Sequence, residues 1–376
     1  MVFSFIDMRY YSLVVTIFYK EEYILGVFNS KNTLSFDFAQ DEIKIVEGKY
    51  TKKGVVVGKS FSLDLPEGLY ENGEIRDMDQ LSYLLRNCLK ENKAMQGEVH
   101  GVVNSTNVIM REVTMPKVDQ AQIKSIINYQ LEDYIPINPQ EYIVNFIILG
   151  SIVEDGIEKL SILLIGVPKV IVETHLHLIK NIDLKPAVLD YQGNAINKLI
   201  FVGEEINNYY PTGDPIACLD LGYENTSLTI THQGTIKVSR VIDIGVKYLV
   251  DLHRNIEDIS EKEIYDKLMN MKDLEDELSP ISDDFRFLEI TKEGFDECLS
   301  RVELVFRYFK TREIGNEISL IVIHGLFSDI EGIDKHISKF FGIPCVKLSS
   351  LEKVKFNGQL SKYANAIGGL IRLSEV

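Results

Sequence analysis

The sequence predicts an α/β fold of two lobes, each with a mixed sheet and flanking helices. Strand-like and helical segments occur in two blocks, one beginning at Ser35 and one at Ala217, and such mixed blocks indicate separate α/β lobes. The chain has 376 residues, which is more than a single hydrophobic core usually holds. Its 45% apolar residues, with 18 Phe and 18 Tyr, exclude a disordered or collagen-like chain.

The first block becomes regular only after its opening segment. Residues 1–34 alternate aromatic and β-branched residues without a clear period, so they form either an extra strand pair or an appended segment. From Ser35 onward, short strands are expected at residues 43–47 and 54–57. A helix is expected over residues 81–89, where leucines recur on one face.

A helix followed by two strands and another helix comes next. Asp119 and Gln122 predict a capping box, because the Asp oxygen can accept the free amide groups of the first turn. Pro136 is expected to end that helix. The elements that follow are strands at residues 142–153 and 160–167 and a helix over residues 168–181.

The second block opens as an antiparallel meander. After the turn-rich residues 211–215, strands are expected at residues 217–222, 226–232 and 235–242, and Gln233-Gly234 forms the turn between the last two. Helical segments then dominate, and the best of them carries an apolar stripe that is expected to be core: Phe295, Leu299, Val302, Phe306 and Phe309. The remaining elements are a strand at residues 318–323, a helix opened by the capping pattern Ser328-x-x-Glu331, and a helical tail from Tyr363.

Charge and cysteine content exclude several functions. Lys and Arg number 40 and Asp and Glu 56, a net charge of −16 without a basic cluster, so binding of nucleic acid through its phosphates is not expected. Residues 251–284 hold 12 acidic and 4 basic residues, so 4 − 12 = −8, half of that net charge. None of the four cysteines has C-x-x-C spacing, which argues against a zinc or thioredoxin-type site.

Membrane insertion is not expected either. The longest uncharged apolar stretch, residues 142–153, is too short to span a bilayer. The start of the chain lacks a small-residue cleavage site, so a cytoplasmic protein is expected.

Two strands each present an aspartate just before a turn, Asp37 in Phe36-Asp37-Phe38-Ala39 and Asp220 in Leu219-Asp220-Leu221-Gly222. A carboxylate there can hold a divalent cation, and a glycine turn can bring amide donors close to a phosphate. Taken alone, the Asp220 pattern favours ordinary turn chemistry over a phosphate site. His175 and His177 are two residues apart, which suits no metal pair, and His324 favours a core or cleft-edge position over a catalytic base.

Further segments carry a family resemblance. They are Val113-Thr114-Met115-Pro116, Tyr129 to Pro136, Arg240 to Gly245, Ile321 to Gly325, and Ala364 to Leu370. With them the chain resembles the actin-like ATPase superfamily, and most closely the PilM family of type IV pilus assembly proteins, over about residues 35–372. The Met-Pro and Tyr-Ile-Pro segments are typical of PilM proteins rather than of sugar kinases or actin.

The resemblance implies a bilobed actin-like fold, similar to the cell-division protein FtsA, with inserted subdomains. The expected domains are residues 1–34 as an extension of unknown role, 35–112 as the first lobe core, 113–185 as an inserted subdomain, 186–214 as the return to the first lobe and the inter-lobe connection, 215–250 as the second lobe core, 251–316 as an outer helical, acidic subdomain, and 317–376 as the C-terminal part of the second lobe core.

The resemblance also implies ATP and Mg²⁺ between the lobes. Asp37 and Lys44 would face the phosphates or metal from the first hairpin, with Asp37 and Asp220 acting through Mg²⁺. The other implied residues are Asp220, Gly222, Asn225 and Thr226 on the second hairpin, Gly245 and Gly325 on the nucleoside side, and Gly368 for close helix packing. No catalytic residue is implied.

The sequence departs from the family pattern at two places. The first turn reads Asp37-Phe38-Ala39-Gln40 where the family has Asp-Ile-Gly-Ser, and a Cβ at a position that needs positive φ costs about 1 kcal/mol or more. Leu326 follows Gly325 where the family has a second glycine, and its side chain would fill space meant for the base or ribose. Both changes argue against a strong ATPase.

The function expected from the resemblance is a scaffold at the cytoplasmic face of the inner membrane. It would bind the N-terminal cytoplasmic tail of a PilN-like membrane protein, and other pilus assembly proteins or a second copy of the chain are further possible partners. Nucleotide would then select one arrangement of the lobes rather than drive chemistry. The alternative is an active ATPase or phosphotransferase of the same superfamily, FtsA-like or kinase-like.

Overall fold

The structure is a computed structural model that describes residues 32–135, 138–154, 156–209, 213–256, 259–271, 273–275, 282–312 and 316–372. The segment 1–31, Pro136 as a helix stop, and part of the expected turn at residues 211–215 lie outside these residues. The chain forms two compact units, and in the described part the first comprises residues 32–51, 61–192 and 369–372, the second residues 52–60 and 193–368. Within the described residues, no helix is long and apolar enough to cross a membrane.

The first unit is built on a sheet with strand order β10-β6-β1-β2. β1 (Thr33–Phe38) is antiparallel to β2 (Glu42–Thr51) and parallel to β6 (Glu98–Val103), which is parallel to β10 (Lys185–Tyr191). Alternate β1 residues, such as Phe36 and Phe38, enter a core shared with the helices α1 (Met78–Glu91) and α3 (Lys169–Asn181). The apolar side chains of β1 therefore face these helices, and Asp37 lies on the opposite face of the sheet.

Smaller strands complete this part of the chain. β4 (Tyr70–Glu71) and β5 (Glu74–Ile75) form a short hairpin. β3 (Gly54–Asp64) begins in the second unit, where Val55 pairs with Val354 of β16 (Val354–Lys355).

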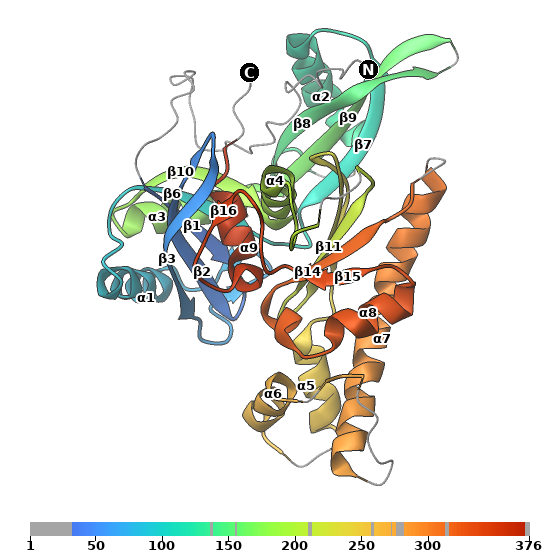
Figure 1. The fold of residues 1–376 in the computed structure, drawn as a ribbon. Helices are drawn as coiled ribbons and strands as arrows, with labels where there is room; N and C mark the ends of the chain where they lie inside the picture. Colours follow the sequence, from blue (N-terminus) through green and yellow to red (C-terminus); the bar gives the residue numbers. More distant parts are fainter. Residues whose placement is uncertain are drawn as a thin grey trace. The chain divides into compact units, whose positions relative to one another are not determined.

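A separate three-stranded antiparallel sheet also belongs to the first unit, with order β7-β9-β8. Its strands are β7 (Ile109–Pro116), β8 (Tyr142–Glu154) and β9 (Ile157–Pro168). Figure 1 shows α2 (Gln120–Tyr134) beside this sheet, and the two share a core of their own. The predicted capping box is confirmed, because Asp119 accepts from the Gln122 amide at 2.8 Å and the Gln122 side chain accepts from the Asp119 amide.

The second unit is built on a five-stranded sheet with order β13-β12-β11-β14-β15. The predicted meander is confirmed as β11 (Ile216–Leu221), β12 (Thr226–His232) and β13 (Thr235–Ile242), followed along the sheet by the parallel strands β14 (Leu320–His324) and β15 (Cys345–Lys347). Gln233 and Gly234 both have positive φ, 49° and 76°, as a tight hairpin turn requires.

The helices of the second unit surround this sheet. They are α4 (Gln192–Gly203), whose first residue still belongs to the first unit, α5 (Val246–Arg254), α6 (Glu261–Met269), α7 (Asp283–Arg312), α8 (Ile333–Phe341) and α9 (Leu360–Gly369), with the short 3₁₀ helix η2 (Leu326–Asp329). The predicted stripe of α7 is buried in the core of the unit, which confirms it.

The capping pattern predicted at Ser328 is wrong. Ser328 lies inside η2, and its hydroxyl donates to the Gly325 carbonyl at 2.8 Å. α8 begins four residues later than that pattern requires, after Gly332, whose φ of 81° suits glycine. The hydroxyl closes a 3₁₀ turn because Gly325, with φ 87°, first turns the chain sharply after β14.

Candidate functional site

The first hairpin buries a charged cluster on the sheet face opposite its aromatic core. Asp37 of β1 lies directly across from Lys44 of β2. Asp37 is fully buried, Lys44 is 6% exposed and Glu42 is 4% exposed, and the Lys44 Nζ lies 3.6 Å from a Glu42 carboxylate oxygen. The Gln192 side chain, at the end of β10, donates to Asp37 Oδ1 at 3.1 Å. Ionised groups this deeply buried persist only when they are paired and hydrogen-bonded.

The turn of this hairpin is unstrained, contrary to the sequence prediction. The Ala39 amide donates to the Glu42 carbonyl at 3.0 Å, and Ala39 has a negative φ. In the second hairpin the Gly222 amide makes the equivalent bond to the Asn225 carbonyl at 3.1 Å, also without a positive φ. The expected strain at Ala39 is therefore wrong, because this turn closes in a conformation open to any residue.

The second hairpin presents Asp220, which is 8% exposed, between two polar side chains. The Asn365 amide of α9 donates to Asp220 Oδ2 at 2.7 Å. His324 faces Asp220 across the parallel strands, and its Nδ1 lies 3.8 Å from Asp220 Oδ1. A Cβ on Gly325 would collide with that same oxygen, so Gly325 packs against the carboxylate.

Four other predicted residues support the turn of this hairpin. The Thr226 hydroxyl donates to the Ile244 carbonyl at 2.8 Å and so points into the unit. Gly245 lies so close to the backbone of Tyr223 and Asn225 that a Cβ would overlap it. Thr226 and Gly245 thus hold the backbone of the turn in place, and Gly222 and Asn225 close it.

The last two positions singled out in the sequence lie at the ends of helices. Gly368 of α9 packs against the Ala195 backbone of α4, where no Cβ would fit. Leu326 packs against the core of the second unit. The predicted residues therefore form two sets, Asp37 and Lys44 in the first unit and the other seven in the second.

Sequence reasoning missed the partners of the two aspartates. Gln192, Asn365 and His324 contact them, and although His324 and Asn365 lie in segments that carry the family resemblance, the resemblance assigned none of the three this role. For Gln192 and His324 the signal was positional: β10 and β14 end in the same sheets as the two hairpin strands, which only the sheet order reveals.

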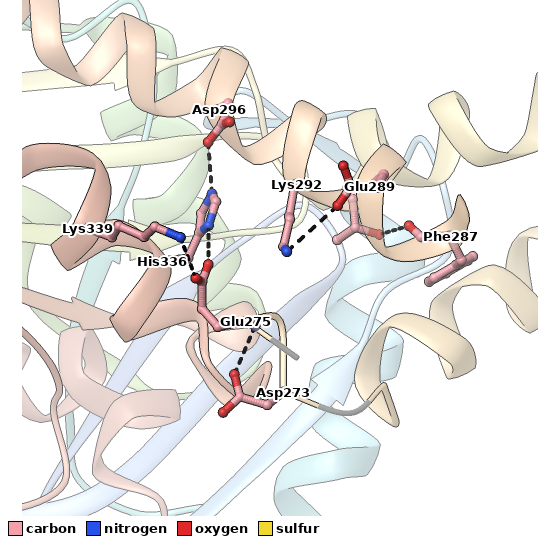
Figure 2. A network of polar contacts seen from close by, with 9 residues as sticks. Asp273, Glu275, Phe287, Glu289, Lys292, Asp296, His336 and Lys339 are labelled. Carbon is pink, nitrogen blue, oxygen red and sulfur yellow. Dashed lines mark hydrogen bonds and ion pairs between the residues drawn. The ribbon is translucent and has the colours of Figure 1, made fainter. Parts of the chain in front are cut away.

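A third polar cluster lies in the outer part of the second unit (Figure 2). His336 of α8 has its Nδ1 2.8 Å from Glu275 and its Nε2 2.8 Å from Asp296 of α7, and Lys339 donates to Glu275 at 3.0 Å. Burial opposes the ionisation of Glu275, but the bonds from His336 and Lys339 lower its pKa. The ion pair of Glu275 with Lys339 therefore offsets part of the negative charge of residues 251–284. The same network ties the segment after α6 to α7 and α8.

Neither hairpin alone is a complete metal site. Among the described residues, no group of three or more His, Cys, Asp or Glu side chains could hold a metal ion. Magnesium usually keeps several waters and binds through one or two carboxylates together with substrate phosphates. Single buried carboxylates at Asp37 and Asp220 fit that mode of binding.

Comparison with known proteins shows the family. A family model described as type IV pilus assembly protein PilM matches residues 35–366. The chain belongs to the PilM family.

Solved structures show the same actin-like ATPase fold as this PilM family chain. A PilM-PilN type IV pilus biogenesis complex superposes with a TM-score of 0.74 at 17% identity, covering 91% of this chain and 98% of that one. The ethanolamine utilization protein EutJ from Carboxydothermus hydrogenoformans gives 0.54 at 9% identity, with 92% and 90% covered. MreB5 of Spiroplasma citri, bound to ADP, gives 0.50 at 13% identity, with 90% and 95% covered.

Proposed function

We propose that this PilM family protein is a cytoplasmic scaffold of a type IV pilus assembly platform. The observation that carries the proposal is the family match over residues 35–366, which includes the whole subdomain of β7, α2, β8 and β9. In the similar solved structure the PilM protein is in a complex with PilN. The partner proposed here is accordingly the N-terminal cytoplasmic tail of a PilN-like membrane protein, which would hold the scaffold at the inner face of the membrane.

The exposed side of α2 is the surface proposed for this partner. Its inner side, with Ile123, Ile127 and Leu131, is fully used by the core that it shares with the sheet. On the outer side Tyr129 is 90% exposed, more than any other large apolar residue recorded for the described chain. An exposed tyrosine supplies a large contact area at a low cost in conformational entropy, which suits a binding surface.

A binding measurement with synthetic tails tests this proposal. Peptides of the N-terminal cytoplasmic tails of membrane proteins encoded beside this gene are titrated into the full chain by calorimetry, with a scrambled peptide as reference. Saturable binding by one tail is expected, weakened about tenfold by Tyr129→Ala, which corresponds to about 1.4 kcal/mol. Tyr83→Ala on α1 is the matched control, because Tyr83 is also exposed (65%) but lies on a different helix.

Two results would count against parts of this proposal. If no tail binds while the protein releases phosphate steadily from ATP, the alternative of an active ATPase or phosphotransferase replaces it. If a tail binds equally well to Tyr129→Ala and to the unchanged chain, the scaffold stands and the α2 surface is wrong.

Nucleotide binding is the second part of the proposal. ATP with Mg²⁺ is the proposed ligand of Asp37 and Lys44 in the first unit and of the Asp220 hairpin in the second, and the magnesium ion would neutralise phosphate charge there. In either unit the aspartate would act on phosphate through magnesium, and in the first unit the Lys44 ammonium would offset phosphate charge. Binding energy would then select a conformation rather than drive chemistry.

Other interactions follow from the same scaffold role. Further pilus assembly proteins and a second copy of the chain are proposed partners, and the net charge of −16 argues against nucleic acid as a partner.

A further inference from the structure

The chain passes between its two units at four points, and two of them lie next to the strand-end aspartates. One crossing falls between Gln192 and Gly193, and another between Gly368 and Gly369. Gln192, which bonds Asp37, is the last residue before the first of these crossings. Asn365, which bonds Asp220, lies three residues before the second.

In both amide side chains the nitrogen is hydrogen-bonded and the oxygen is not. Gln192 is 6% exposed and Asn365 is 3% exposed. The nitrogen of each donates to an aspartate, whereas Gln192 Oε1 and Asn365 Oδ1 are buried without a hydrogen-bond partner among the described residues. A buried polar atom without a partner is costly in a native protein, and it indicates a group that a water, an ion or a ligand completes.

The orientation of the Asn365 amide is determined by its neighbour. An ionised carboxylate only accepts hydrogen bonds, so the amide nitrogen must face Asp220 Oδ2 and the amide oxygen must face away from it. A free amide oxygen beside a carboxylate is a suitable acceptor for a water bound to a divalent cation, since hard cations take carboxylate and amide oxygens. Asp220 itself keeps unused lone pairs, because a carboxylate accepts at about four sites.

Contacts within the second unit connect this amide to the crossing. The Ser361 carbonyl, at the start of α9, accepts from the Gly325 amide at 3.0 Å. At the other end of α9, Gly368 lies directly on the Ala195 backbone of α4, just after the other crossing. Asn365 therefore lies in the one short helix that joins these two contacts.

We propose that Asn365 is a ligand-contacting residue that binds the hydrated divalent cation accompanying a nucleotide. This inference rests on the nucleotide part of the proposed function. The Asn365 nitrogen holds the Asp220 carboxylate in position, and its oxygen accepts from a water of the cation held at that carboxylate. Occupancy of the second hairpin is thereby transmitted along α9 to the crossing between Gly368 and Gly369.

Manganese provides the probe for this site. The full chain is titrated with Mn²⁺ in the presence and absence of ATP, free Mn²⁺ is measured by electron paramagnetic resonance, and hydrogen–deuterium exchange is followed in peptides over residues 360–372. Asn365→Ala is expected to weaken Mn²⁺ binding about tenfold, while ATP binding in the presence of a chelator changes less than twofold. Slowing of exchange in α9 on addition of Mn²⁺ and ATP is expected in the unchanged chain and not in the variant.

Two further variants separate a ligand contact from a structural one. Gln359→Ala removes a comparable amide, which donates to Asp329 at 3.4 Å just before α9 on an exposed surface, and it is expected to bind Mn²⁺ like the unchanged chain. Asn365→Asp keeps the size of the side chain and adds a carboxylate beside Asp220. It is expected to lower the thermal midpoint without metal and to show a larger rise on addition of Mn²⁺ than the unchanged chain shows. This comparison remains available if Asn365→Ala fails to fold.

The outcomes separate the two proposals. If the unchanged chain binds Mn²⁺ and ATP and Asn365→Ala binds Mn²⁺ within twofold of it, Asn365 is only structural and this inference is overturned. If the unchanged chain binds neither, the inference falls together with the nucleotide part of the proposed function, whereas tail binding is decided by its own titration.

Discussion

The two units arrange their strands in the same order but surround their aspartates differently. In each sheet a hairpin strand carries the aspartate at its fifth position, with an antiparallel strand on one side and a parallel strand on the other: β1 between β2 and β6, and β11 between β12 and β14. Lys44 lies across from Asp37, whereas Ser227 lies across from Asp220. The first carboxylate accepts from Gln192 and shares its hairpin with a buried cation, Lys44, whereas the second accepts from Asn365 and lies near His324.

This difference predicts different roles for the two hairpins in ligand binding. Each aspartate accepts a hydrogen bond from a neutral amide, but only the first hairpin also buries an ammonium, Lys44, beside Asp37 and Glu42. A cation would therefore meet a protein cation at the first hairpin and Ser227 across the second, which favours the second hairpin for a metal ion. Lys44, in contrast, is suited to offset phosphate charge.

The largest expected effect comes from breaking the buried charge cluster. Lys44→Met leaves the Asp37 and Glu42 carboxylates buried near each other without their cation, so the free energy of unfolding should fall by about 3 kcal/mol. Ser227→Ala, at the matching position of the second hairpin, should cost less than about 1 kcal/mol. Urea denaturation of both variants measures the difference, and equal losses would remove the distinction between the hairpins.

A second effect, nearly as large, appears at acid pH and starts from the core of the first unit. His175 is fully buried, and this burial lowers its pKa to about 4, while its Nδ1–H donates to the Ile171 carbonyl at 2.6 Å. The unfolded chain therefore binds this proton at a higher pH than the folded chain does. The resulting stability is complete above about pH 6.5 and is lost as the pH falls toward 4, by up to about 3 kcal/mol.

This prediction is tested with a His175 variant, a control at His177 and a comparison with His253 of the second unit. His175→Gln should flatten the loss of thermal midpoint between pH 6.5 and 4, whereas His177→Gln, two residues along α3 and exposed, should leave the curve unchanged. His253 in the second unit has its pKa lowered to about 4 by burial and by Lys267, and its Nε2 lies 2.9 Å from the Thr291 hydroxyl. If only one unit unfolds at acid pH, the histidine of the other unit is protonated in the folded protein, contrary to this prediction.

Local patterns in the sequence were sufficient to predict most elements and the family. The capping box at Asp119 and the apolar stripe of α7 are read within a few residues, and the structure contains both. The family resemblance likewise rests on short segments, and the match over residues 35–366 confirms it.

The amide partners were beyond such reasoning because they depend on long-range pairing. Gln192 meets Asp37 across 155 positions and Asn365 meets Asp220 across 145. The error at Ser328 had a local cause instead, since its hydroxyl bonds to Gly325 three residues earlier, where the chain turns sharply after β14. The family pattern has a glycine in the turn where this chain has Ala39, and the φ of Ala39 shows that this turn does not require glycine.

A smaller effect concerns cation binding at the two aspartates. Asp220→Asn should weaken Mn²⁺ binding in the presence of ATP by at least about tenfold, or about 1.4 kcal/mol, because it removes the charge that no lysine across the hairpin offsets. Asp37→Asn should reduce it less, since a buried cation, Lys44, lies across the hairpin from that carboxylate. Titrations followed by paramagnetic resonance compare the two, and a larger loss in Asp37→Asn would reverse the assignment of the cation to the second hairpin.

The smallest effect is expected from exchanging the turn residues of the two hairpins. A Cβ on Gly222 would lie 2.8 Å from the Asn225 carbonyl oxygen, so Gly222→Ala should destabilise the protein by about 1 kcal/mol as that turn shifts. Ala39→Gly should cost between about 0.4 and 1 kcal/mol, because it only adds conformational freedom to the unfolded chain. Thermal midpoints measure both, and a gain in stability from Ala39→Gly would show that the first turn is strained after all. Because Ala39 already closes its turn with negative φ, we expect the glycine to restore no nucleotide affinity at the first hairpin.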